Sequence, residues 1–450
     1  VDLKHTFDPN NLFNPGVILS DKSILEDLRP VVSQQELTTA FDWKDDLSFY
    51  YAVEKCNGAG VCRKSIGGIM CPSYKATRGE EFSTRGRANL LRKALSSEDP
   101  TKSLKNSELK EALDLCLACK ACKSECPANV DMAKLKSEYL FQIRNAGSYV
   151  KSWHIKNLGY ILKIGSKAPD TFNFLQSSFL GRKLIGFERQ PPLLQKKSLS
   201  DWWSACKTNN EDCSTTVWVI VDIFTQYYDV SIGQDVLNLL KKCKVNIKVV
   251  FPKNSIVAMV SYGLLNEAKN ELKILHSQLN DAAKNDLIVG IEPSEVLVWR
   301  DEAKSLLNGR LPNVLLFEEL LLELDQLKVL PKFHALNTKV WVYEHCHQKS
   351  LAETENVIKS LELIPELQIE IINGGCCGMA GEFGYKFPEI SDTIAHQSLD
   401  NYMSRVGKND VLVVTGTSCR KQILDIFSIR SIHWPQLFNN TIKMKVNIEE

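Results

Sequence analysis

Short apolar runs rich in β-branched residues recur in the second half of the chain. The runs VWVIV, from residue 217, and VWVYE, from residue 340, are each followed by a polar loop, a segment with helical spacing of apolar residues, and a second apolar run. This order predicts strand–loop–helix–strand units whose strands are parallel.

The two units are related by an internal repeat. The first runs are 123 residues apart, and the later runs DLIVGIEPSEVLV and VLVVTGTSCRKQI match at an offset of about 124. A repeat of this length indicates duplicated structural units. We therefore expect two tandem α/β domains, packed face to face, over residues 216–330 and 331–450.

The region before the repeat has helical patterns. The segment STRGRANLLRKAL, from residue 83, predicts a capped helix with a basic first turn, which carries Arg85 and Arg87. These guanidinium groups either lower the charge cost of an anionic group or lie on a solvated helix face. The predicted fold is an all-α, ferredoxin-like domain over 49–145, a helical linker over 146–215, and the two α/β domains.

Composition excludes several classes of protein. The 450 residues are 44% apolar and can bury several cores, while the net charge of +1 gives no global field for nucleic acid or membrane. No apolar run approaches the roughly 18 residues of a spanning helix, and no signal peptide is recognised. We expect a cytoplasmic protein without a nucleic-acid partner. Peripheral attachment to the inner face of a membrane and homo-oligomerisation stay open.

Fourteen cysteines in a chain with no secretion signal indicate metal binding or catalysis rather than disulfides. Cys206, Cys213 and Cys243 have no ligand spacing and are interpreted as ordinary small residues. The other eleven form two groups: Cys56, Cys62, Cys71, Cys116, Cys119, Cys122 and Cys126, and then Cys346, Cys376, Cys377 and Cys419.

The run CLACKACKSECP, residues 116–127, has the spacing C-x2-C-x2-C-x3-C-P. This spacing is typical of iron–sulfur ligation, and in two-cluster ferredoxins the fourth cysteine binds the other cluster. Structural zinc more often takes two separated cysteine pairs. We therefore predict a [4Fe–4S] cluster at Cys116, Cys119 and Cys122.

A reciprocal run lies upstream, with Cys56, Cys62 and Cys71 before Pro72, but residue 59 is Ala where a second cysteine would stand. If the runs exchange ligands, Cys71 completes the first cluster. Cys56, Cys62 and Cys126 then supply three thiolates, one fewer than a second [4Fe–4S] cluster with four cysteine ligands needs. They form a three-cysteine cluster, a cluster with another ligand, or a vestigial site, so one cluster is expected and a second is uncertain.

The second cysteine group falls at or just past the predicted strand ends, where parallel sheets place their sites. Iron–sulfur, zinc or exchangeable thiols remain alternatives for it, as does a tight GGCCG turn with buried thiols. His345 and His347 flank Cys346. The corresponding positions of the first copy hold no cysteine; they are Ile223, Lys253, Asn254 and Glu295. We therefore expect the first copy to bind no metal.

The motifs together resemble a known family. They are CNGAGVC, MCPSYKATRGEEFSTRGRANLLR, CLACKACKSECP, FTQYYDVSIG, EHCHQKSL, GGCCGMAGEFGY and SCRKQI. The chain resembles the cysteine-rich (CCG-domain) iron–sulfur subunits of glycolate oxidase, anaerobic glycerol-3-phosphate dehydrogenase and heterodisulfide reductase. It is more similar to fused FAD/Fe–S proteins that oxidise D-2-hydroxy acids such as D-lactate or D-2-hydroxyglutarate.

The opening FDPNNLFNPGVIL resembles the last segment of an FAD-linked oxidase domain, which suggests a tail over 1–22 and a linker over 23–48. With no initiator Met, we expect a fragment that lacks its flavin domain. The resemblance implies an oxidoreductase portion that passes electrons from FAD, held elsewhere in the same polypeptide, through a [4Fe–4S] cluster to a quinone, a cytochrome or another carrier. Catalytic residues are not assigned. A heterodisulfide-reductase-like thiol/disulfide module and a non-catalytic docking module are the alternatives.

Overall fold

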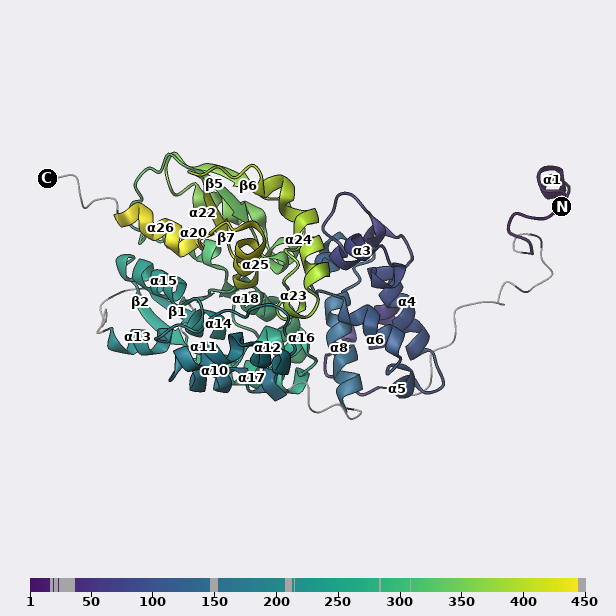
Figure 1. Cartoon of the computed structure of the whole chain (residues 1–450), viewed down its shortest axis with the longest axis horizontal. Coiled ribbons are helices and arrows are strands. Elements are labelled where there is room, and N and C mark those ends of the chain that lie inside the picture. Colours follow the sequence, from purple (N-terminus) through teal and green to yellow (C-terminus); the bar gives the residue numbers. More distant parts are fainter. Residues whose placement is uncertain are drawn as a thin grey trace.

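The computed structural model describes residues 1–16, 19, 23, 37–145, 153–206, 213, 215–282, 285–307 and 309–443. Residues 17–18, 20–22 and 24–36 of the proposed tail and linker, and residues 146–152, 207–212 and 214, lie outside the described residues. Helix α1 (Asp2–Phe7) lies within the proposed tail. A helical domain stands beside two stacked α/β domains (Figure 1).

The first domain is all-helical, as predicted. The segment from residue 83 forms a helix over Thr84–Leu95, and the Ser83 hydroxyl caps it by accepting a hydrogen bond from the Gly86 N–H at 2.9 Å. The helices of this domain are α2 (Phe49–Glu54), α3 (Pro72–Thr77), α4 (Thr84–Leu95), α5 (Pro100–Ser103), α6 (Ser107–Asp114), α7 (Ala121–Glu125) and α8 (Met132–Asn145).

The connecting region is helical where it is described. Its short helices pack around Leu162 and Leu194, which are buried with Ile223 and Tyr227 of the first α/β domain. The region is therefore docked on that domain along part of its length. Its helices are α9 (Trp153–Lys156), α10 (Leu158–Gly165), α11 (Pro169–Ser177), α12 (Phe179–Ile185) and α13 (Leu199–Ala205).

The first α/β domain has a parallel sheet in the order β2-β1-β3-β4. Its strands are β1 (Thr216–Ile220), β2 (Asn246–Val250), β3 (Leu287–Gly290) and β4 (Val314–Leu315). Its helices are α14 (Ile223–Tyr227), α15 (Val230–Lys242), α16 (Ile256–Ser261), α17 (Leu265–Leu279), α18 (Pro293–Arg300), α19 (Glu302–Leu306) and α20 (Phe317–Gln326).

The second α/β domain repeats this topology with the parallel order β6-β5-β7. Its strands are β5 (Lys339–Tyr343), β6 (Gln368–Ile371) and β7 (Val411–Val414), and Ile432 adds an isolated parallel bridge beside β7. Strand β5 starts 123 residues after β1, and β7 starts 124 after β3, which confirms the predicted strand offsets. The helices are α21 (Cys346–Leu351), α22 (Thr354–Leu361), α23 (Phe383–Lys386), α24 (Pro388–Met403), α25 (Thr417–Phe427) and α26 (Trp434–Lys443).

The two sheets share one hydrophobic core. Val217 and Val289 of the first sheet and Val340 and Val413 of the second belong to the same buried cluster, across which α15 packs on α26 and α20 on α22. The helical domain contacts both copies, because α8 packs on α16 and α17 while α7 packs on α21. The loop before α7, which carries Lys120, therefore lies where three domains meet.

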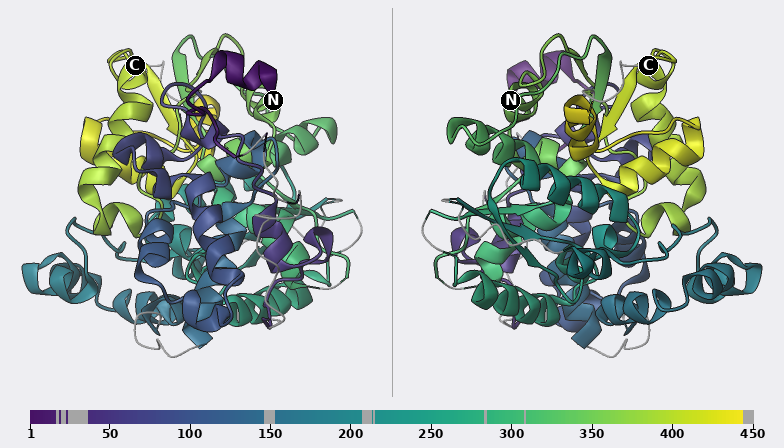
Figure 2. Two further views of the ribbon diagram at one scale, coloured as in Figure 1. Left: turned by 90° about the vertical axis from the view of Figure 1, so that its right-hand side faces the viewer. Right: turned by 90° about the vertical axis from the view of Figure 1, so that its left-hand side faces the viewer.

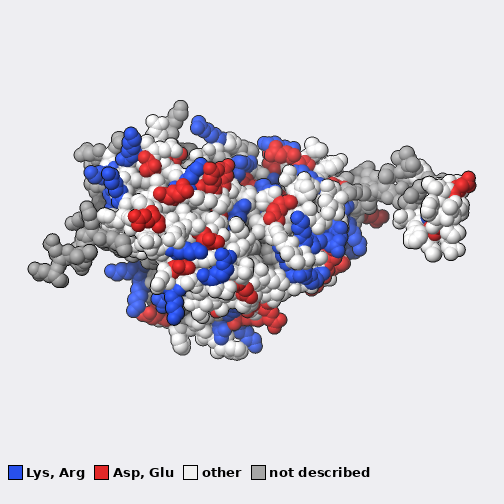
Figure 3. All heavy atoms as spheres, turned by 90° about the horizontal axis from the view of Figure 1, so that it is seen from above, with Lys and Arg blue, Asp and Glu red and all other residues white. Residues whose placement is uncertain are grey.

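Among the described residues, no helix has the length and apolar character needed to cross a bilayer. Acidic and basic side chains are interspersed over the face seen in Figure 3, in keeping with the net charge of +1.

Candidate iron–sulfur site

Four cysteines from both sequence runs line one cavity of about 320 Å³, its mouth included. Cys71 stands at the N-terminus of α3, Cys116 and Cys119 lie in the loop between α6 and α7, and Cys122 lies in α7. This is the set expected from ligand exchange between the runs. Four cysteines that line one cavity fit the donor set of a [4Fe–4S] cluster.

Backbone and hydroxyl donors point at two of these sulfur atoms. The Thr84 N–H donates to the Cys71 sulfur at 3.1 Å, with the Thr84 hydroxyl 2.9 Å away, and the Met132 N–H donates to Cys122 at 3.4 Å. Such bonds stabilise thiolate charge and raise the reduction potential of a cluster. Two short helices, α3 and α7, and the N-termini of α4 and α8 therefore define the site.

A buried arginine also lines this cavity. Arg87 is only 2% exposed, and its guanidinium donates to the Ala112 carbonyl at 2.7 Å and to the Ser73 hydroxyl at 2.8 Å. The hydrogen bond from Cys62 and burial raise the pKa of the Cys71 thiol, and the Arg87 charge opposes this rise. A solvated helix face, the alternative left open for Arg87, is therefore wrong. Arg85 is more exposed and forms an ion pair with Glu80 at 2.8 Å.

The remaining cysteines of the first group are arranged less regularly. The thiol of Cys62 hydrogen-bonds to Cys71, which lowers the pKa of Cys62 to about 6. The hydrogen bond to Glu80 raises the pKa of Arg85, and the nearby thiols of Cys62 and Cys56 add to this rise. Cys126 follows α7 and, within the described part of the chain, is not among the residues that line the cavity.

The second cysteine group forms a separate thiol site. Its side chains are linked by hydrogen bonds that run from Cys346 to Cys376, on to Cys377, and from there to Cys419. Cys346 is the first residue of α21, the Cys376–Cys377 pair follows β6, and Cys419 lies in the first turn of α25. The structure thus gathers all four at the carboxyl edge of the second sheet.

Two polar side chains support this thiol site. The Tyr343 hydroxyl donates to the Gly375 carbonyl at 2.5 Å, and Lys349 donates to the Gly374 carbonyl at 2.7 Å while lying over the Tyr343 ring. Burial lowers the pKa of Lys349, and the nearby thiols oppose that effect. Gly378 has φ +89°, and a side chain there would collide with the Ser391 carbonyl, so the turn requires glycine.

The geometry bears on which chemistry the thiol site can support. Across the described ranges, no group of three or more His, Cys, Asp or Glu side chains is arranged to hold a single metal ion. Zinc, a polynuclear cluster and exchangeable thiols stay the predicted alternatives for these four thiols.

The cluster loop and the thiol site touch each other. The Nε2 atom of His347, next to Cys346, donates to the Ala118 carbonyl at 2.9 Å, and the Ser350 hydroxyl lies 3.4 Å from the Cys119 carbonyl. Burial raises the pKa of the Cys119 thiol, and the proximity of Cys346 raises it further. The two cysteine groups therefore form one contiguous region across a domain boundary.

The same loop is held from the other side by the first α/β domain. Lys120 is 3% exposed, and its ammonium group lies 2.6 Å from Asp301 and 2.5 Å from Glu302. Lys123 also pairs with Asp301. Burial opposes ionisation of Asp301, but the two lysines hold its pKa well below the usual range. Sequence reasoning missed these partners because no local motif marks them.

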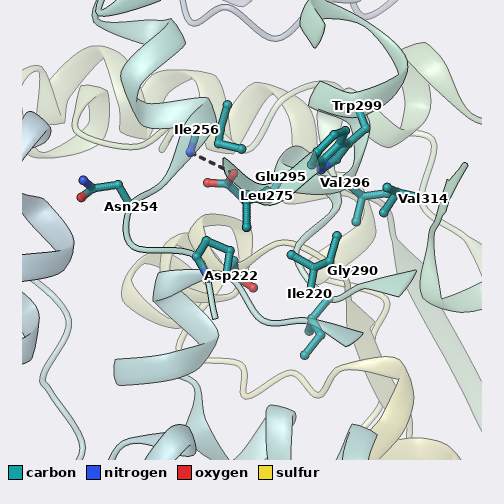
Figure 4. A pocket seen from close by; sticks show the side chains of 12 residues that line it. Ile220, Asp222, Asn254, Ile256, Leu275, Gly290, Glu295, Val296, Trp299 and Val314 are labelled. Carbon is teal, nitrogen blue, oxygen red and sulfur yellow. Dashed lines mark hydrogen bonds between the residues drawn. The ribbon is translucent and has the colours of Figure 1, made fainter. Parts of the chain in front are cut away.

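The first α/β copy has a cavity at the corresponding sheet edge (Figure 4). Glu295, which aligns with Cys419, accepts hydrogen bonds from the Ile256 and Val257 N–H groups at 3.1 and 3.4 Å and from the Ser255 hydroxyl. It therefore stabilises the start of α16. Asn254, which aligns with Cys377, bonds to Gly159 and Lys156 of the helical connection. Ile223, which aligns with Cys346, is buried in the core.

The helical domain and the chain as a whole are similar to known proteins. A family model described as a 4Fe–4S dicluster domain matches residues 52–130. The chain is 29% identical to the D-2-hydroxyglutarate dehydrogenase of Escherichia coli K12 and 26% identical to that of Pseudomonas putida, over 94% of this chain and 47% and 46% of those proteins. It is 22% identical to one of the subunits of the anaerobic glycerol-3-phosphate dehydrogenase of E. coli K12, over 55% of this chain and 65% of that relative.

No solved structure matches the chain. The chain spans about half the length of the D-2-hydroxyglutarate dehydrogenases that it matches. The dicluster model covers the helices that carry both cysteine runs. The chain is thus similar to the C-terminal half of D-2-hydroxyglutarate dehydrogenases, and its residues 52–130 match the model of a 4Fe–4S dicluster domain.

Proposed function

We propose that this chain is the electron-transfer portion of a flavin-dependent D-2-hydroxy acid dehydrogenase, with D-2-hydroxyglutarate as the preferred candidate over D-lactate. The observation that carries the proposal is the convergence of Cys71, Cys116, Cys119 and Cys122 on one cavity. The similarity to D-2-hydroxyglutarate dehydrogenases over 94% of the chain supports the substrate class.

The residues of the cavity have distinct roles in this proposal. The four thiolates are the ligands, and Arg87 balances their charge without access to solvent. The Thr84 and Met132 N–H groups stabilise sulfur charge. A bound [4Fe–4S] cluster would supply single-electron transfer between FAD in the other half of the protein and a quinone, cytochrome or other carrier.

The thiol site is the candidate for the next electron-transfer site after the cluster. Its His347 and Ser350 contact the loop that carries Cys116 and Cys119, so no intervening domain separates the two sites. Cys346, Cys376, Cys377 and Cys419 serve either as ligands of a further cluster or as exchangeable thiols. In both roles, Lys349 is a nearby cation that can balance thiolate charge.

A second candidate function is thiol–disulfide exchange, which the hydrogen-bonded thiols favour. Oxidation of two adjacent thiols to a disulfide would release two electrons and two protons, which the partner disulfide or carrier must accept. A docking role for the first copy is compatible with either function, since Asp301 and Glu302 hold Lys120.

Anaerobic purification followed by iron and sulfide analysis and EPR of the reduced protein tests the proposal. We expect about four irons at the Cys71 cavity, unchanged in a control in which Cys346, Cys376, Cys377 and Cys419 are all Ser. Loss of all iron from that control would move the cluster to the thiol site, whereas loss of only part of it would indicate a further cluster there. Protein without iron or sulfide after reconstitution would leave the thiol or docking function.

The substrate is tested in the longer protein that includes the flavin half. We expect D-2-hydroxyglutarate to bleach the cluster absorbance faster than D-lactate does, with L-2-hydroxyglutarate as the stereochemical control. A faster response to D-lactate would contradict the substrate assignment and leave the electron-transfer role intact.

A further inference from the structure

Helices α11 and α12 form a hairpin that projects from the body of the protein (Figure 2). Five large apolar side chains within eleven residues of this hairpin are mostly exposed: Phe174 74%, Leu175 59%, Phe179 72%, Leu180 71% and Leu184 88%. We call them the hairpin surface. Single exposed apolar residues are ordinary on proteins, but a contiguous group of this size marks an interaction site.

The exposure follows from how the hairpin packs. Phe172 turns toward the small core around Leu162 and Leu194, and a side chain at Gly181 would collide with the Leu175 carbonyl. These contacts use the inner faces of both helices. In α12, positions 179, 180, 183 and 184 share the opposite face by helical spacing, so exposed Lys183 accompanies Phe179, Leu180 and Leu184.

The surroundings of the hairpin are strongly basic. Between residues 153 and 198 there are two acidic residues, Asp170 and Glu188. The same segment has eight basic ones: Lys156, Lys163, Lys167, Arg182, Lys183, Arg189, Lys196 and Lys197. The local balance of +6 contrasts with +1 for the whole chain. Lys156 and Arg189 form ion pairs with Glu267 and Asp392 outside the segment, which leaves a balance of +4. Exposed aromatic and leucine side chains among lysines are typical of helices that lie in the interface of an anionic membrane.

We propose that the hairpin surface binds the anionic lipid surface of a membrane. The apolar side chains would enter the boundary between head groups and acyl chains, while Lys163, Lys167 and Lys183 would contact lipid phosphates. Attachment would be interfacial, because no helix in the described ranges could span the bilayer. A second copy of this chain and the other half of the longer protein are the competing occupants. The positive charge around the hairpin favours an anionic lipid surface over both.

Sedimentation of the full chain with vesicles tests this proposal. We expect binding to vesicles of mixed phosphatidylglycerol and phosphatidylcholine at low salt, weak binding to pure phosphatidylcholine, and release as salt is raised. The triple variant Phe179→Ser, Leu180→Ser, Leu184→Ser should lower the affinity by at least about tenfold. Ile66→Ser is the matched control, because Ile66 is 90% exposed on the helical domain, and it should bind like the unaltered chain.

A second variant separates charge from apolar contact. Replacing Lys163, Lys167 and Lys183 by Gln should weaken binding to the anionic vesicles by about tenfold or more and flatten its salt dependence. Equal binding by both triple variants and the unaltered chain would overturn the proposal. So would a dimer in gel filtration that the serine variant converts to monomer, or vesicle binding that is lost once the flavin half precedes the chain.

Discussion

The Nε2 atom of His347 donates a hydrogen bond to the carbonyl oxygen of Ala118 across 2.9 Å, joining the second α/β domain to the loop between two proposed cluster ligands. Ala118 has φ +50° and Lys120 has φ +61°, both unusual for residues with a side chain. Each lies at a contact with a different α/β domain. The loop conformation is therefore stabilised by both copies of the repeat.

His347→Ala should loosen this loop. The Ala118 carbonyl would lose its buried donor, which costs about 1–3 kcal/mol of unfolding free energy. We expect lower stability in denaturant and a shorter cluster lifetime in air, both measured on the full chain. Ser350→Ala is the control, since its contact with the Cys119 carbonyl is longer, at 3.4 Å, and its effect should be smaller. Equal effects of the two substitutions on stability and cluster lifetime would contradict the role of the His347 hydrogen bond in stabilising the loop.

Lys120→Met should be strongly destabilising, because it leaves Asp301 and Glu302 buried without their main counter-charge. Breaking such a buried pair costs about 3–5 kcal/mol. Adding Asp301→Asn and Glu302→Gln to Lys120→Met should recover part of that loss, which a mutant cycle in urea would measure. Additive losses would show that the charges do not act on one another.

Cys71→Ala should remove most of the low-temperature EPR signal of the reduced protein, because Cys71 lines the same cavity as Cys116, Cys119 and Cys122. Cys126→Ala is the matched control from the same helical domain. If Cys126→Ala loses the signal and Cys71→Ala retains it, the proposed ligand exchange between the two cysteine runs is wrong.

Glu295→Gln should change how stability depends on pH. Burial raises the pKa of Glu295 to about 8, from the ordinary 4.5. The folded protein therefore holds a proton that the unfolded chain releases in that window, and stability falls as the pH rises through it. Because Gln is neutral at every pH, the stability of the variant does not show this fall.

Thermal unfolding at roughly pH 5 and pH 8.5 would measure the difference. We expect similar stability of the two proteins at the lower pH. At the higher pH, the variant should be more stable by on the order of 2 kcal/mol. Asp222, whose pKa burial raises to about 6, is present in both proteins, and its charge contributes to the raised pKa of Glu295. If the stabilities of the two proteins change in parallel with pH, the pKa of Glu295 is not raised in the folded protein.

Several features could be predicted because they are encoded locally. The cysteine spacing of residues 116–127 indicates a cluster loop whatever surrounds it. The period of apolar residues defines the strands, and the offset of 123 relates β1 to β5. The cap at Ser83 follows from a hydroxyl that stands directly before a helical pattern. Each of these signals spans a few turns of chain or repeats in sequence.

The tertiary structure decided what depends on domain packing. His347 and Ala118 are 229 residues apart, and Lys120 and Asp301 are 181 apart, so no local pattern pairs them. The spacing around Arg87 suits a solvated face equally well, and it is the contact of α4 with α6 and α3 that buries it, with hydrogen bonds to Ala112 and Ser73. The hairpin surface is apolar by sequence, but its exposure depends on which faces of α11 and α12 the body covers. Contacts between distant segments form only when the domains meet, because burial and charge pairing depend on separation in space and not along the chain.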